Sequence, residues 1–163
     1  FFNVNIIDKE KQKWSADGAD TINFLVRLNK GSNEGEIHKV SSGGELSRLM
    51  LAINLVIAQS INRKTLIFDE VDSGVSGAVS EAIGIRLLDL SNYQQVFTVT
   101  HLPQVASRGN KHFIAIKNER DGVAYTSVKE LSETERADEI AKMISGNVVT
   151  EEAIMLSNKL LKK

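Results

Sequence analysis

A short apolar strand that ends in two acidic residues constrains the fold of this chain more than any other feature. Residues 65–68 favour a strand, and Asp69 and Glu70 follow directly. A glycine-containing loop, a helical pattern over about residues 77–89 and a second apolar run at 95–100 come next. This order predicts a βαβ unit, with parallel strands and a right-handed crossover. We therefore expect an α/β fold with a mostly parallel sheet and flanking helices.

The ends of these two strands are expected to gather candidate catalytic side chains. Asp69 and His101 are 32 positions apart, the length of one βαβ unit. Because the carboxyl ends of parallel strands meet at one edge of a sheet, we expect both side chains to share a crevice. A histidine without such a placement is usually structural, which is our interpretation of His38 and His112.

The two adjacent carboxylates suit phosphoryl transfer. In such a site Asp69 is placed to coordinate Mg²⁺, and Glu70 is placed to polarise an attacking water. The alternative is a strand that runs into an acidic surface turn. Taken alone, the two interpretations are equally good.

A glycine turn stands directly before a second helical pattern. Ser41-Ser42-Gly43-Gly44-Glu45 leads into an apolar pattern over residues 45–60. Glycines let a ligand approach the backbone, and a helix N-terminus favours a phosphate; the alternative is a serine N-cap after a turn. The helix is apolar over most of its circumference, which predicts that it is buried. Arg48 either couples a bound nucleotide to the rest of the fold or makes a surface salt bridge, and both interpretations stay open.

The polar loop after the two acids, residues 71–77, contains two glycines. Its polar residues, among them Asp72 and Ser76, suit contact with a partner subunit. The alternative is an ordinary strand-to-helix loop in which Ser76 caps the next helix. Both interpretations can hold together.

Regular elements are also expected on both sides of this central unit. Residues 2–7 and 21–28 favour a hairpin or two sheet strands, and residues 29–35 favour a loop. Pro103 suits the first turn of a short helix. Asp121-Gly122, between two strand-like runs, predicts a hairpin in the C-terminal part.

Two helices are predicted after that hairpin. Ser132 and Glu135 form a capping box for a helix that Gly146 ends. A last helix follows Thr150, with acids at its start and lysines near its end, as the helix dipole favours. We find no repeat or linker, and we expect residues 1–163 to form a single domain.

Composition narrows the possible environments and partners. A formal net charge of -1 gives no global reason to bind DNA, so any DNA contact must be local or lie elsewhere. The chain has no cysteine, which fits a reducing compartment. No apolar run approaches the roughly 20 residues that span a bilayer, so no membrane contact is expected. The start lacks methionine, and we expect a fragment of a longer polypeptide.

These motifs together resemble those of the ABC ATPase superfamily. Residues 42–48 resemble the ABC signature motif, residues 66–70 the Walker B motif, residues 72–77 the D-loop, and His101 the switch histidine. Within that superfamily, four strings are similar to those of the RecN family of DNA double-strand-break repair ATPases. They are Ser-Gly-Gly-Glu-Leu-Ser-Arg, Phe-Asp-Glu-Val-Asp-Ser-Gly-Val-Ser-Gly, Thr-His-Leu-Pro-Gln-Val-Ala and Ile-Ala-Lys-Met-Ile-Ser-Gly.

The resemblance implies the carboxy-terminal lobe of a head like those of SMC and Rad50 proteins. A coiled coil separates it from an amino-terminal lobe with Walker A, and two heads form a homodimer around ATP and Mg²⁺. Asp69 would bind the metal, Glu70 would act on water and His101 would sense the γ-phosphate. Residues of the signature and the D-loop would contact the opposite head or the nucleotide that it holds. These residues are Ser42, Gly43, Gly44, Glu45, Asp72 and Ser76. The whole protein would act on DNA ends or single-stranded DNA in the bacterial cytoplasm, associated with the nucleoid.

The Walker A pattern Gly-x-x-x-x-Gly-Lys-Ser/Thr does not occur in the chain. Because this loop cradles the phosphates, the chain alone is expected to be inactive. Two alternatives are a head lobe of another SMC-like or ABC ATPase, and a non-catalytic dimerisation or DNA-binding module. Arg63-Lys64, Arg108 with Lys111 and the terminal lysines are candidate DNA contacts, although scattered lysines usually serve solubility.

Overall fold

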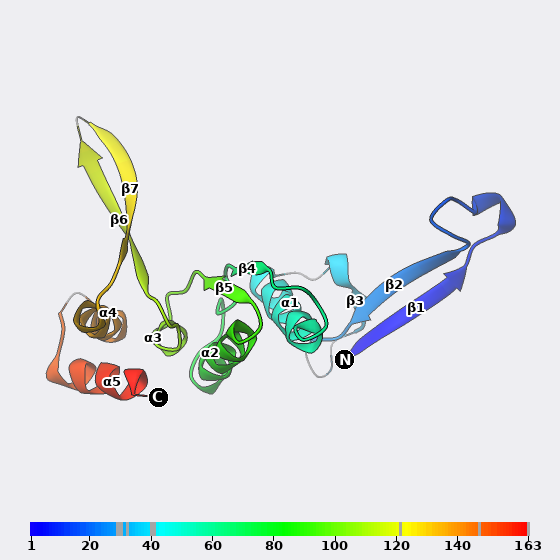
Figure 1. The fold of residues 1–163 in the computed structure, drawn as a ribbon. Coiled ribbons are helices and arrows are strands. Elements are labelled where there is room, and N and C mark those ends of the chain that lie inside the picture. The colour runs from blue at the N-terminus through cyan, green and yellow to red at the C-terminus, as the bar shows by residue number, and fades with distance from the viewer. Residues whose placement is uncertain (29–30, 32, 40–41, 121, 147, 163) are drawn as a thin grey trace.

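The computed structural model describes residues 1–28, 31, 33–39, 42–120, 122–146 and 148–162. Its elements follow one another from an N-terminal hairpin through a central βαβ unit to a second hairpin and two helices (Figure 1). Two short 3-10 helices, η1 (Lys11–Lys13) and η2 (Ile37–Lys39), lie in the N-terminal part. Among the described residues, no helix is long and apolar enough to cross a membrane.

Two antiparallel hairpins confirm the predicted outer elements. Strand β1 (Phe2–Asp8) pairs with β2 (Asp20–Val26) along its whole length, and β3 (Gly35–Glu36) adds two residues to the other edge of β2. Strand β6 (Phe113–Arg120) pairs with β7 (Val123–Glu130). Gly122 supplies the positive φ of 76° at that turn. The other turn residue, Asp121, and part of the loop predicted at residues 29–35 lie outside the described residues.

The central unit is the predicted βαβ. Strand β4 (Thr65–Phe68) and strand β5 (Gln95–Thr98) are parallel, in the register Thr65 to Gln95 through Phe68 to Thr98. Helix α2 (Ala78–Ser91) connects them. Strand β5 is two residues shorter than predicted, because the ladder ends where the chain turns into the loop before α3. This two-stranded pair is the parallel sheet of the described chain.

Helix α1 (Gly43–Ile57) packs on this unit with one face. The core around the sheet is formed by Leu51, Ala58, Phe68, Val71, Ile83, Leu87, Leu90 and Val105. The prediction that α1 is buried is wrong for this chain: within the helix only Gly44 and Leu51 are buried, and Val56 is 82% exposed. The apolar circumference is present, but the described elements cover only the side that faces α2 and the sheet.

The C-terminal helices begin at the predicted caps. Helix α4 (Glu133–Ser145) starts at the capping box of Ser132 and Glu135 and ends at Gly146. A hydrogen bond from Lys129, with further bonds from Ser132, lowers the pKa of Glu135 to about 2. Helix α5 (Glu151–Leu161) starts at Thr150, whose side chain accepts from the Ala153 N–H.

A buried arginine joins α4 to α3 (Pro103–Ala106), the short helix that begins at the predicted proline. The Arg136 side chain is 6% exposed and donates from Nη2 to the carbonyls of Ser107, at 2.8 Å, and of Gly109. Burial, with Arg136 nearby, holds the pKa of His112 below its usual range. The Nδ1 atom of His112 is buried and has no hydrogen-bond partner among the described residues.

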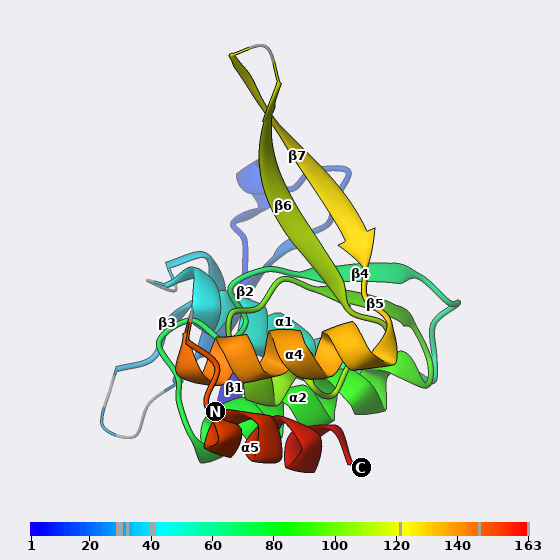
Figure 2. The ribbon, with the colours of Figure 1, turned by 90° about the vertical axis from the view of Figure 1, so that its left-hand side faces the viewer.

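The elements form an elongated molecule. In Figure 1 the β1–β2 hairpin extends from one end, α4 and α5 lie at the other, and the central unit lies between them. In Figure 2 helices α1 and α2 lie below β4 and β5, and the β6–β7 hairpin rises above the strands. The central unit therefore has its helices on one face of its sheet.

Candidate functional site

Strand β4 delivers two carboxylates to the carboxyl edge of the sheet. The Phe68 carbonyl accepts hydrogen bonds from the Val99 N–H at 2.9 Å and from the Thr98 hydroxyl at 3.2 Å, so the two strands are joined up to the last residue of β4. Asp69 and Glu70 follow, and both are exposed. Asp69 Oδ1 accepts the Glu70 N–H at 2.9 Å, which fixes one carboxylate oxygen and leaves the other oxygen as a ligand atom.

Glu70 has an unusual backbone conformation. Its φ of 55° makes it the one residue other than glycine with a positive φ in the described part of the chain. The turn is closed by the Ser73 N–H, which donates to the Glu70 carbonyl at 2.9 Å. A non-glycine residue in this region costs free energy and is tolerated where the surroundings hold it. We name residues 69–73 the Asp-Glu loop.

The glycine turn before α1 lies against this loop. The Ser42 side chain caps α1 by accepting the Glu45 N–H at 3.2 Å, so the serine-cap interpretation is confirmed. A Cβ added to Gly43 would lie 2.6 Å from Oε2 of Glu70, and one added to Gly44 would lie 3.0 Å from the Glu70 carbonyl oxygen. The Glu70 carboxylate therefore lies at the N-terminal end of α1. Ser41 lies outside the described residues.

The third sequence-predicted group, His101, reaches this edge through Asp72. The Asp72 side chain is buried, at 1% exposure, and its Oδ2 accepts a hydrogen bond from the Thr100 hydroxyl. Nδ1 of His101 is 3.9 Å from Oδ1 of Asp72, and the His101 side chain is 74% exposed. The structure thus brings His101 to the loop after β4, where it lies beside Asp72.

Ser76 does not cap α2, contrary to one interpretation of the loop. Helix α2 is capped by Gly77, at a φ of 55°, and no side chain caps its first turn. The Ser76 side chain is exposed. The capping interpretation is wrong because a glycine with positive φ ends the loop one residue later. The partner-contact interpretation stays a prediction.

Two residues of α1 contact the Asp-Glu loop. Ser47 was not predicted from the sequence, and the role of Arg48 was left open. The Ser47 hydroxyl donates to the Asp69 carbonyl at 2.8 Å. Nη1 of Arg48 donates to the Ser73 carbonyl at 2.9 Å and to the Val71 carbonyl at 3.3 Å. The helical spacing from Gly44 to Ser47 and Arg48 places all three on one face, which was the available signal.

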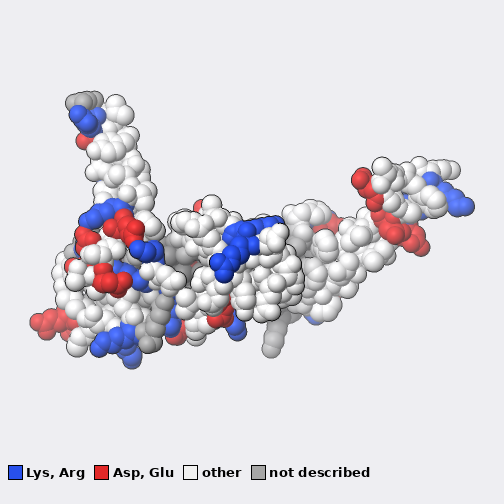
Figure 3. All heavy atoms as spheres, viewed as in Figure 1, with Lys and Arg blue, Asp and Glu red and all other residues white. Residues whose placement is uncertain are grey.

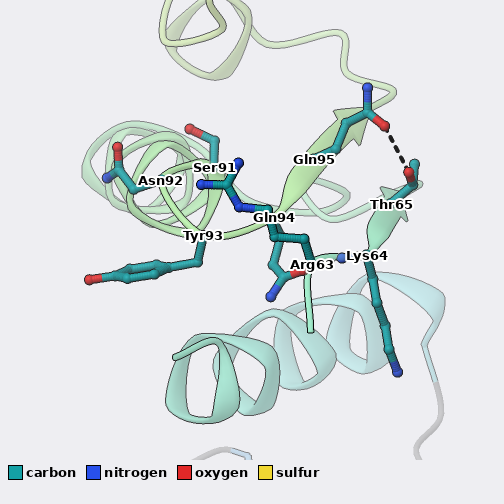
Figure 4. Close-up of a pocket in the computed structure, with 8 residues that line it drawn as sticks. All are labelled: Arg63, Lys64, Thr65, Ser91, Asn92, Tyr93, Gln94 and Gln95. Atoms are coloured by element: carbon teal, nitrogen blue, oxygen red, sulfur yellow. Dashed lines mark hydrogen bonds between the residues drawn. The ribbon is translucent and has the colours of Figure 1, made fainter. Parts of the chain in front are cut away.

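A cavity of about 440 Å³ opens at the opposite edge of the same two strands (Figure 4). It lies between the start of β4, the start of β5 and the C-terminal end of α2. Its lining residues are Arg63, Lys64, Thr65, Ser91, Asn92, Tyr93, Gln94 and Gln95. Gln94 is bound on both sides, to the Lys64 N–H and to the Ala58 carbonyl, so it serves the fold. The candidate chemistry therefore lies away from this cavity.

The residues at the carboxylate edge fit a magnesium nucleotide. Mg²⁺ usually takes one or two protein carboxylates and completes its shell with water and phosphate oxygens. Asp69 alone meets that requirement, and the described residues contain no cluster of three or more metal-ligating side chains. The start of α1, a helix of 15 residues, offers a phosphate the N–H groups of its first turn other than that of Glu45, which the Ser42 side chain binds.

Sequence comparisons place the chain beside DNA repair proteins. No family model matches it. It is 39% identical over 160 residues to the "DNA repair protein RecN" of Rickettsia conorii, covering 98% of this chain and 29% of the relative. For RecN of Bacillus subtilis the identity is 39% over 158 residues, covering 97% of this chain and 27% of the relative. The chain thus spans less than a third of the length of these curated relatives.

Solved structures show a similar fold. An Smc head domain with a coiled coil and joint from Pyrococcus yayanosii matches with a TM-score of 0.58 and 19% identity, over 85% of this chain and 25% of that one. An Smc head domain with an extended coiled coil from Pyrococcus furiosus, bound to the C-terminal domain of ScpA, matches with a TM-score of 0.54 and 21% identity. This match covers 88% of this chain and 34% of that one. At this identity the likeness concerns the fold alone.

Proposed function

We propose that this chain forms the carboxy-terminal lobe of an ATP-hydrolysing head. The premise is that the chain is a homologue of a part of the RecN-type DNA repair proteins. The observation that carries the proposal is the meeting of three motifs at one sheet edge. Asp69 and Glu70 follow β4, the Ser42–Gly44 turn lies against Glu70, and His101 lies beside Asp72. Such a lobe supplies a metal ligand, a base and a phosphate-binding turn. It needs a second lobe to hold the nucleotide.

Each residue then has a chemical role. Asp69 binds Mg²⁺, which neutralises phosphate charge when the nucleotide is bound. Glu70 accepts a hydrogen bond from the attacking water and orients it, and His101 donates to a γ-phosphate oxygen. Ser42, Gly43 and Gly44 bind the γ-phosphate of nucleotide held by a second head. Glu45 and Ser76 belong to the same contact between heads, and Asp72, whose side chain is buried and bonded to Thr100, supports this contact from within its own chain.

Exposed apolar surface around the central unit supports a further covering lobe. Ile67 of β4 is 73% exposed and Val99, after β5, is 62% exposed. Both belong to near-continuous apolar runs, which are typical of parallel strands that are covered on both faces. We propose that an amino-terminal lobe with Walker A covers this face, so that the chain acts as one lobe of a bipartite head.

The test is to co-express this chain with the Walker A lobe of the same protein and to compare the parent with Glu70→Gln. We expect the variant to slow ATP hydrolysis by roughly 100-fold or more, as for loss of a catalytic acid or base, and to prolong the ATP-bound dimer. Glu119→Gln, on the projecting strand β6, is the matched control. Equal rates for the parent and Glu70→Gln would refute the assignment of the base. The chain on its own is expected to be inactive.

DNA is the proposed partner of the whole protein, in the cytoplasm and at the nucleoid. Figure 3 shows both basic and acidic side chains at each end of the molecule, and a small basic group over the central unit. Such a surface gives a local and not a global attraction to DNA. We expect DNA ends or single-stranded DNA to stimulate hydrolysis by the complete head. An ATPase rate unchanged across DNA forms and salt concentrations would contradict the repair function while leaving the ATPase proposal intact.

A further inference from the structure

The hydrogen bonds of Arg48 run to the backbone of the Asp-Glu loop. One nitrogen, Nη1, donates to the carbonyls of Ser73 and Val71, at 2.9 and 3.3 Å. These carbonyls lie 25 and 23 residues further along the chain. Charge-assisted bonds of this kind are roughly twice as strong as neutral ones. Arg48 is therefore built to hold this loop.

The same face of α1 makes further contacts to the Asp-Glu loop. The Ser47 hydroxyl donates to the Asp69 carbonyl at 2.8 Å. A Cβ added to Gly44 would lie 3.0 Å from Nη1 of Arg48, 3.0 Å from the Glu70 carbonyl oxygen and 3.1 Å from the Ser73 Cβ. Arg48 thus fills the space beside Gly44, directly behind the turn that faces a phosphate. Helix and loop form one packed unit.

Glu70 is the residue whose backbone most needs such support. Its positive φ is costly for a residue with a side chain, so the loop would relax to another conformation without outside contacts. The Glu70 carbonyl oxygen lies against Gly44 and accepts a hydrogen bond from the Ser73 N–H. The Ser73 carbonyl in turn accepts a hydrogen bond from Arg48. Loss of the arginine would free the Val71–Ser73 end of the turn that carries Glu70.

We propose that Arg48 is a positioning residue for hydrolysis: it locks the Asp-Glu loop onto α1, so that the Glu70 carboxylate is held in register with the Ser42–Gly44 turn of the same chain. This inference rests on the proposed function. It adds a consequence for the dimer, in which the turn of one chain binds the nucleotide of the other. A phosphate that binds the turn contacts the end of α1 that also positions Glu70. Binding of nucleotide at one site is therefore coupled to the position of the base at the other.

The first test measures the loop itself and requires no ATPase activity. Amide hydrogen exchange is followed on this chain for the parent, Arg48→Met and Arg48→Lys, with Arg86→Met as matched control. Arg86 is an exposed arginine of α2 paired with Asp89 of the same helix at 3.0 Å. We expect exchange at the Ser73 amide to be at least about tenfold faster in Arg48→Met, as the weakening of one charged hydrogen bond predicts. Arg48→Lys should be intermediate, since an ammonium can reach one carbonyl but lacks the planar fork. Arg86→Met should match the parent.

The second test uses the complete head. In Arg48→Met we expect kcat to fall by about 100-fold, the usual cost of misplacing a catalytic group by about 1 Å. The KM for ATP should change little, because the Walker A lobe holds the nucleotide. Arg48→Lys should recover part of kcat, and Arg86→Met should lose none.

Each outcome has a separate meaning. Faster exchange at Ser73 together with a lower kcat supports the inference. Unchanged exchange in Arg48→Met overturns it whatever the ATPase does, and faster exchange with an unchanged kcat overturns the positioning role. A Glu70→Gln head that is as active as the parent instead overturns the proposed function, and the catalytic role of Arg48 falls with it. Comparing Glu70→Gln with Arg48→Met therefore separates the two failures.

Discussion

The hydroxyl of Thr100 donates a hydrogen bond to the buried carboxylate of Asp72, which ties the loop after β4 to the loop after β5. Thr100→Val keeps the shape of the side chain and leaves this carboxylate without its hydroxyl donor. We expect a loss of about 1.5–3 kcal/mol in the free energy of unfolding, the usual worth of a hydrogen bond to a charged group. Urea denaturation of the chain measures it.

The matched control for this substitution is Thr65→Val. Thr65 belongs to the same sheet, but its hydroxyl bonds to the exposed side chain of Gln95, at 2.7 Å. We expect it to cost less than about 0.5 kcal/mol, as surface substitutions usually do. Equal stabilities for the two variants would show that Thr100 and Asp72 do not hold the loops together.

Alanine at the two glycines of the turn should separate stability from activity. The atom in the way at Gly43 is the flexible end of the Glu70 side chain, at 2.6 Å, whereas Gly44 faces a backbone carbonyl and the Ser73 Cβ at 3.0 and 3.1 Å. Gly43→Ala should keep or slightly raise the melting temperature, since alanine is the better helix former, while moving Glu70 and slowing hydrolysis in the complete head. Gly44→Ala should destabilise the chain by about 1–3 kcal/mol, as overpacking does. Thermal melts that rank the two variants the other way would contradict this geometry.

Arg136→Met should loosen the joint between α3 and α4. The substitution removes the donor for the carbonyls of Ser107 and Gly109, and we expect a loss of about 1.5–3 kcal/mol in urea denaturation. It also removes a positive charge beside His112, so the pKa of His112 should rise, although burial still keeps it below 6.5. An NMR titration of His112 checks this second effect. A His112 pKa that falls or stays constant would place the arginine elsewhere.

The capping box of α4 should give acid-dependent stability. Because the pKa of Glu135 is about 2 in the folded chain, against an ordinary value of 4.5 for a glutamate, its stabilisation is fully present above pH 4.5 and is lost as the pH falls toward 2. Glu135→Gln should therefore be less stable than the parent at pH 6, and the difference should shrink between pH 4.5 and 2. Glu133→Gln, in the same first turn, is the control. A stability difference independent of pH would contradict the charged role of Glu135.

Elements that depend on local sequence were predictable. The hairpins, the capping box at Ser132 and the proline-led α3 each follow from neighbouring residues, and the order of strand, helix and strand placed β4 beside β5. These signals act over a few residues or one supersecondary unit. They fix the sheet edge to which Asp69 and His101 belong.

Contacts between distant segments were not predictable. The apolar circumference of α1 indicates that the helix needs cover on several sides, but not that the described elements supply only one of them. Arg48 and Arg136 bond to main-chain carbonyls more than 20 residues away, and any residue type offers a carbonyl there. The positive φ of Glu70 has no sequence signal either, because glycine or asparagine is the usual residue in that conformation.

The φ of Glu70 also opposes the stability of the fold to the rate of hydrolysis. At position 70 glycine would adopt a φ of 55° without strain, so Glu70→Gly should yield a chain that is easier to fold and an enzyme that no longer activates water. Selection for stability alone would therefore remove the glutamate. Under the proposed role, Glu70 is a residue at which this fold gives up stability to retain a group that activates water.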